Sequence, residues 1–91
     1  MSYVERLTAT DTEATFELEG SHLLLFKHNG GTWALSILTP DDEEIAVTAI
    51  TGDTQQALAH LPEGTRIKLS GGTVGAKAWT GKVKREVGDF L

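Results

Sequence analysis

The sequence predicts an all-β fold, either a small antiparallel β-sandwich or a Greek-key barrel of about six to eight short strands. Segments that alternate apolar and polar residues recur along the chain, turn sequences with glycine or proline separate them about every ten residues, and no long segment has a convincing helical period. Because 91 residues without a proline-rich, serine-rich or single-sign stretch hold one core, we expect a single domain over residues 1–91, with termini that are free to be flexible.

Three strands are predicted in the first part of the chain, over residues 14–19, 22–28 and 32–38. The Asn29-Gly30 pair between the second and the third predicts a β-hairpin, because both turn residues tolerate the positive φ that a tight turn needs. Trp33 lies on the third strand among aliphatic neighbours, so we expect it in the core.

The next turn is predicted at residues 39–42, where proline fixes φ and two aspartates follow it. A fourth strand then covers residues 44–50. Its alternation places three apolar side chains on one face: Ile45, Val47 and Ala49.

Residues 54–61 fit either a short helix or a strand. Their helix propensity favours a helix, whereas the all-β context favours a strand, and both interpretations stay open at this point. A Pro-Glu-Gly turn at residues 62–64 follows.

The last part of the chain predicts a strand over residues 65–70, with Ile67 and Leu69 inward and two basic residues outward. Beyond a glycine-rich connection, residues 76–80 and 82–87 form either two short strands or one strand with a bulge at the intervening Gly81.

The chain has a net charge of −5, and the charges are unevenly distributed. Residues 1–63 hold eleven acids and two bases, whereas residues 64–91 hold six bases and two acids, so the two parts carry −9 and +4. Adjacent strands that neutralise each other within one fold explain this most simply. The alternative is a dipolar surface that favours association with copies of the chain or with a lattice protein.

Length and composition also bear on stability and location. A domain this small buries only about 60 to 65% of the surface of its unfolded chain. Because cysteine is absent, disulfides cannot stabilise it, and we expect oligomerisation or docking to do so. The start shows no export signal, and the longest apolar stretch, residues 23–26, is too short to span a membrane, so we expect a soluble protein.

Catalytic and metal-binding patterns are weak. The acidic residues 41–44 lack the alternation and the glycine of a calcium loop, and His22, His28 and His60 lack the spacing of metal ligands. Residues 71–77 are glycine-rich but lack the ending of a phosphate-binding loop. The sequence contains no recognisable catalytic motif in which a nucleophile lies beside a base and an acid that orients the base. We therefore expect no enzymatic activity, no metal and no cofactor.

Trp79 is the best candidate for a contact residue, because its neighbours are polar and an indole in such a setting often lies at an interface. The basic residues around it and the two apolar residues at the C-terminus complete the predicted protein interface: Lys77, Trp79, Lys82, Lys84, Arg85, Phe90 and Leu91.

The same basic segment, together with Trp79, is also similar to the surfaces that bind single-stranded nucleic acid. The acidic protein as a whole and its few aromatic residues disfavour that function, so we expect no nucleic-acid partner and keep this interpretation as an alternative only.

Three segments resemble small bacteriophage virion proteins: residues 30–35 (GGTWAL), 61–73 (LPEGTRIKLSGGT) and 76–79 (AKAW). The resemblance spans roughly residues 14–80. It implies a compact β-sandwich that decorates the capsid or joins the tail, and its motifs also suit the turn chemistry of other β-sandwiches.

The resemblance implies a non-catalytic structural protein that cements the capsid lattice, located in virions assembled in the host cytoplasm. Its expected partners are other copies of itself, as a homo-oligomer, and a phage coat or tail protein. The alternatives are a tail-accessory or adaptor protein of the virion and a small soluble binding module, either an inhibitor of a host protein or a nucleic-acid binder.

Overall fold

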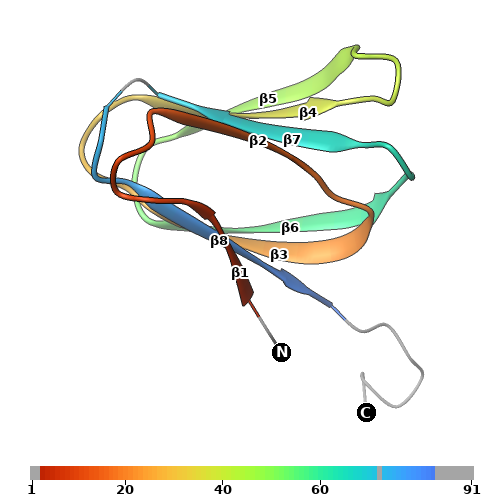
Figure 1. Ribbon diagram of the computed structural model, residues 1–91, viewed down its shortest axis with the longest axis horizontal. Coiled ribbons are helices and arrows are strands. Elements are labelled where there is room, and N and C mark those ends of the chain that lie inside the picture. The colour runs from red at the N-terminus through yellow and green to blue at the C-terminus, as the bar shows by residue number, and fades with distance from the viewer. Residues whose placement is uncertain (1–2, 72, 84–91) are drawn as a thin grey trace.

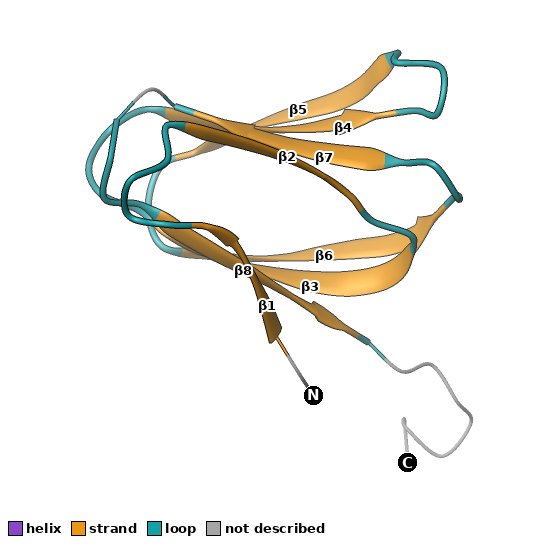
Figure 2. Ribbon diagram, in the orientation of Figure 1, coloured by secondary structure: helices purple, strands orange, loops and turns teal. Residues whose placement is uncertain are grey.

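The structure, a computed structural model, describes residues 3–71 and 73–83 and is a sandwich of two four-stranded antiparallel sheets (Figures 1 and 2). The β-sandwich prediction is confirmed. Within those residues, no helix has the length and apolar character that crossing a membrane requires. The strands are β1 (Tyr3–Leu7), β2 (Glu13–Glu17), β3 (Gly20–Lys27), β4 (Trp33–Leu38), β5 (Glu44–Ile50), β6 (Thr54–Leu61), β7 (Arg66–Ser70) and β8 (Lys77–Lys82).

Strand order identifies the topology. The first sheet has the order β1-β8-β3-β6 and the second has the order β2-β7-β4-β5. The strands therefore pair from the two ends of the chain inward: β1 with β8, β2 with β7, β3 with β6 and β4 with β5. The chain is a long antiparallel double strand rolled into two layers, which is the jelly-roll form of the β-sandwich.

The predicted hairpin at Asn29-Gly30 is wrong. β3 pairs with β6 and β8, whereas β4 pairs with β5 and β7, so the segment between β3 and β4 crosses from one sheet to the other. Gly30 has a positive φ, but Asn29 does not, which excludes the turn type that this pair favours. The Asn29 side chain instead accepts hydrogen bonds from the indole N–H of Trp33 and the backbone N–H of Gly31, both at 3.1 Å.

Two further interpretations are resolved. Residues 54–61 form the edge strand β6, so the helix is wrong there: pairing with β3 provides the backbone hydrogen bonds, and Leu58 reaches the core. Gly81 lies inside β8 and keeps the regular register with β3, so it marks neither a strand break nor a bulge. Residues 84–87 of the predicted last strand lie outside the described residues.

The core lies between the two sheets. Trp33 is fully buried, as predicted, and so are Ile67 and Leu69, which β7 directs inward as expected. Large aliphatic and aromatic side chains fill the space between the layers: Leu7, Leu18, Leu24, Phe26, Trp33, Leu35, Ile50, Leu58, Ile67 and Leu69.

One side of the sandwich, between β1 and β2, is closed by an arginine. The guanidinium of Arg6 lies 4.7 Å from the ring centre of Phe16, and its Nε donates a hydrogen bond of 2.9 Å to the buried hydroxyl of Thr80. This combination of a cation–π contact and a hydrogen bond lets a charged residue join the two sheets at their edge.

The uneven charge distribution is partly neutralised inside the fold. The acidic strand β2 lies beside the basic strand β7, with Glu17 directly opposite Arg66. Arg66 also forms an ion pair with Asp42 in the β4–β5 turn. These pairs favour the simpler explanation of the charge asymmetry, in which neighbouring strands offset each other.

Candidate protein-binding face

The candidate site begins with the apolar run in β3. In an antiparallel strand, successive side chains point to opposite faces of the sheet. Leu24 and Phe26 are buried in the core, so Leu23 and Leu25 lie on the outer face of the same strand, where both are half-buried. An uninterrupted apolar run therefore gives this sheet an apolar surface on its solvent side as well as on its core side.

β8 adds the largest side chain to this outer face. Its neighbours in sequence, Ala78 and Thr80, are buried on the core side, which places Trp79 outward. The register sets Trp79 directly opposite Leu25 of β3 and Glu5 of β1. Its indole is half-buried, so part of a large aromatic surface remains open to solvent.

We call this surface the Trp79 face. It is the outer side of the β1-β8-β3-β6 sheet, where apolar side chains surround Trp79, Glu5 lies beside it and a lysine pair lies at one end. The register places on it Tyr3, Leu23, Leu25, Ala57 and Trp79, together with the polar residues Glu5, Lys27, Gln55 and Lys77.

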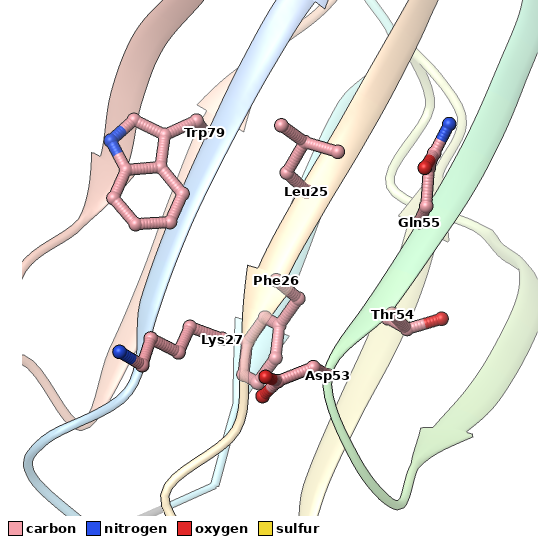
Figure 3. A pocket seen from close by; sticks show the side chains of 7 residues that line it. All are labelled: Leu25, Phe26, Lys27, Asp53, Thr54, Gln55 and Trp79. Atoms are coloured by element: carbon pink, nitrogen blue, oxygen red, sulfur yellow. The ribbon is translucent and has the colours of Figure 1, made fainter.

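A shallow depression lies on this face, with a volume of about 440 Å³. Figure 3 shows Trp79, Leu25 and Gln55 projecting from three neighbouring strands, with Lys27 and Asp53 near one end. Asp53 is held in place because its Oδ1 accepts a 2.8 Å hydrogen bond from the backbone N–H of His28. The depression is too open to enclose a small molecule and suits a side chain from a partner surface.

The lysine end of the face has a net positive charge, because Lys27 and Lys77 outnumber the single carboxylate of Asp53 there. Lys27 of β3 lies directly opposite Lys77 of β8, and like charges in that position repel each other. Within the described residues, the ion pair of the structure joins Arg66 to Asp42 and involves neither lysine. A partner that brings carboxylates to this end would offset the repulsion.

The structure brings together only some of the residues predicted for the interface. Trp79 and Lys77 share the outer face. Lys82 has the opposite parity on β8 and pairs with His22, so it lies on the other side of the sheet at the strand end. The remaining four lie outside the described residues: Lys84, Arg85, Phe90 and Leu91.

The sequence reasoning missed the other members of the face. Leu23 and Leu25 were counted only as part of an apolar run, and Lys27 was not singled out. The available signal was the lack of alternation over residues 23–26, because an antiparallel strand with one solvated face alternates.

The basic residues of the second part of the chain do not form one groove. Arg66 and Lys68 lie on the outer face of the β2-β7-β4-β5 sheet, since the intervening Ile67 is buried in the core. Lys77 lies on the outer face of the other sheet. This separation on opposite sides of the sandwich disfavours a continuous track for a nucleic-acid backbone.

His22 and His60 lie at the same end of the paired strands β3 and β6, where the backbone N–H of His60 donates a hydrogen bond to the Ser21 hydroxyl, and His28 follows the other end of β3. The ring of His22 bonds the backbone carbonyl of Glu19 at 2.8 Å, and Nδ1 of His28 accepts a hydrogen bond from the backbone N–H of Gly30 at 2.9 Å. In the part of the chain that the structure describes, no three His, Cys, Asp or Glu residues are grouped as metal ligands would be.

No protein-family model, curated protein or solved structure matches this chain. The virion resemblance of the sequence motifs therefore stays a prediction.

Proposed function

We propose that this chain is a non-catalytic protein-binding module of a phage virion, which decorates or cements the capsid lattice through the Trp79 face. The observation that carries the proposal is a largely apolar surface built around a half-buried tryptophan on the solvent side of a sheet. Such surfaces mark protein interfaces, because burying them removes apolar area from water. Tryptophan is also among the residues most enriched at binding hot spots.

The chemistry of the face indicates what kind of surface it binds. An apolar centre with Trp79 and Leu25 suits an apolar patch or a projecting side chain that fills the depression. The opposed Lys27 and Lys77 at one end suit carboxylates on the partner. We therefore propose an acidic rim on the lattice protein beside its apolar contact.

The fold supports the virion proposal by analogy only. Jelly rolls occur in viral capsid proteins, and they also occur in lectins and cupins, so topology by itself does not select one function. A face of moderate size is enough for a protein that attaches to a lattice in many linked copies, because avidity raises the overall affinity above that of each contact.

Co-sedimentation with particles from the source lysate tests the virion proposal, with the copy number measured by mass spectrometry against the major shell protein. Comparable abundance would support capsid decoration, and a few copies per particle would support a tail-accessory protein instead. Absence from particles would contradict both and would favour a soluble binding module with a host-protein partner.

Matched variants test the face itself. Trp79→Ala is expected to weaken particle binding about 30-fold or more, as truncating a hot-spot residue does. Lys77→Glu should also weaken binding, whereas Lys68→Glu makes the same charge change on the outer face of the opposite sheet and should leave binding unchanged. Equal effects of the two lysine variants would contradict the assignment of this face.

A further inference from the structure

The edge strand β5 is exposed along nearly its whole length. Six of its seven residues are exposed, and the side chains of Ile45 and Val47 have exposed fractions of 61% and 58%. β4 binds one edge of the strand, and the other edge ends the sheet. The tip of the β4–β5 hairpin lies away from β3 and β6, so the opposite sheet, β1-β8-β3-β6, does not cover it (Figure 1).

In β5 the features that protect a sheet edge, a charge and a bulge, are confined to its acidic end. β1 carries Glu5 and Arg6 and a bulge between Glu5 and Leu7. β2 is short and has a glutamate at each end. β6 ends in an irregular register, and its His60 has a φ of 56°. Charges, bulges and short length are the features that keep sheet edges from pairing with other chains.

The uncharged part of β5 runs over residues 45–50 and contains neither proline nor glycine. Its bulge lies at the acidic end, where Ile45 is the extra residue between Glu44 and Ala46. The rest of the strand keeps a regular register with β4, and no other strand of residues 3–71 and 73–83 pairs with its second edge, which leaves backbone N–H and C=O groups on that edge for another strand. A strand of this kind is a template for another strand.

We infer that β5 pairs antiparallel with β5 of a second copy, so that two sandwiches share one continuous eight-stranded sheet. The strand is self-complementary in this arrangement. With the two-fold axis at Val47, residues 46–48 pair with one another in a regular register, and residues 49 and 50 face the bulged end, residues 45 and 44, of the other copy. On the outer face, Val47 meets Val47 and Ile45 meets Ala49, which joins the apolar side chains of both copies.

The charges select the antiparallel direction. Residues 41–44 form an acidic turn at one end of β5. Parallel pairing would set the two acidic turns side by side. In the antiparallel pair, Glu44 lies opposite Ile50 of the other copy, so the two Glu44 residues are about 20 Å apart along the strands. That separation exceeds the screening length of about 8 Å at physiological salt.

Single cysteines test the register sharply, because the natural chain contains none. Val47→Cys places two thiols directly opposite each other, within reach of a disulfide. Ile45→Cys is a control in the same strand, since its two thiols would lie about 13 Å apart. Val74→Cys is a control at an equally exposed valine in a loop, with an exposed fraction of 61%.

Under mild oxidation, Val47→Cys is expected to give covalent dimers quickly and the two control variants slowly. Failure of Val47→Cys to cross-link would overturn the proposal, and so would equal cross-linking of either control.

Sedimentation equilibrium from about 10 µM to about 1 mM provides the second measurement. One strand pair is a small interface, so we expect a weak dimer, with a Kd of roughly 10 to 500 µM. Val47→Lys sets two ammonium groups against each other and should abolish the dimer, whereas Val74→Lys should leave it intact. A monomer at every concentration in the unmodified chain would overturn the inference and leave β5 to a different partner.

The dependence on salt concentration distinguishes β5 pairing from binding through the Trp79 face. Each copy has a net charge of −5, so added salt should strengthen β5 pairing or leave it unchanged. Binding through Lys27 and Lys77 should weaken with salt. Trp79→Ala should leave the dimer intact, and thus the failure of one proposal is distinguishable from the failure of the other.

Discussion

β4 and β5 are the two strands of one hairpin, and they differ sharply in burial. Half of the residues of β4 are buried, including Trp33 and Leu35, whereas β5 buries only its last residue, Ile50. Both strands alternate apolar residues in the sequence. The difference arises because β4 is an inner strand of its sheet, whereas β5 is an edge strand that the opposite sheet does not cover.

The comparison shows what an alternating pattern means. Alternation states which residues share a face, and the register confirms that Val47 and Ala49 of β5 share one. It does not state whether another layer covers that face. The face with Val47 and Ala49 is the outer one, opposite Ser36 and Ala34 of β4, and solvent reaches it.

The largest expected difference between the strands concerns the directly opposed pair Leu35 and Thr48. Leu35→Ala should lower the free energy of unfolding by about 2 to 5 kcal/mol, because the side chain is 4% exposed and its removal leaves a cavity. Thr48→Ala should change it by less than about 0.5 kcal/mol, since Thr48 is exposed. Urea unfolding of both variants checks this, and similar losses would show that β5 is covered in solution.

Much of the fold could be predicted from local patterns. Alternation located β4, β5 and β7, and Pro40 marked the turn between β4 and β5. Two sequence interpretations of local structure were wrong or unresolved for physical reasons. Asn29 uses its side chain to bind Trp33 instead of forming a tight turn, and in β6 pairing with β3 outweighs helix propensity.

The candidate site was harder to predict than the fold. Trp79 could be identified from its polar neighbours, but the residues around it come from β1, β3 and β6, which pairing assembles over long sequence separations. The opposition of Lys27 and Lys77 follows from register, which no local pattern specifies. The exposure of β5 likewise depends on how far the opposite sheet, β1-β8-β3-β6, extends.

Gly71 and Gly52 provide a second comparison, with an intermediate expected effect on the free energy of unfolding. A Cβ atom at Gly71 would fall on the indole of Trp33, which is fully buried on β4, whereas a Cβ at Gly52, just after β5, would meet open space. Gly71→Ala should therefore destabilise the fold by about 1 to 3 kcal/mol through overpacking. Gly52→Ala should be neutral or stabilise by up to about 1 kcal/mol, because alanine restricts the unfolded chain.

Thermal unfolding of the two glycine variants measures this difference. Equal melting temperatures would mean that Trp33 can move away from residue 71, and that the start of β4 is packed less tightly than its full burial indicates.

The smallest expected effect concerns the ion pair that links the β4–β5 turn to β7. Asp42→Asn removes the charge that pairs with Arg66, while asparagine still tolerates the φ of 68° at this position. Because the Asp42 side chain is 73% exposed, the loss should be at most about 1 kcal/mol at low salt and should vanish at high salt.

Asp41→Asn is the matched control for this ion pair, since it removes one charge from the same acidic run and leaves the pair with Arg66 in place. Relief of repulsion among residues 41–44 should make Asp41→Asn neutral or slightly stabilising, so the difference between the two variants isolates the ion pair. If that difference is absent at low salt, β4 alone holds the hairpin in position. If it appears and disappears with added salt, Arg66 restrains the acidic end of β5, where the bulge at Ile45 interrupts regular pairing.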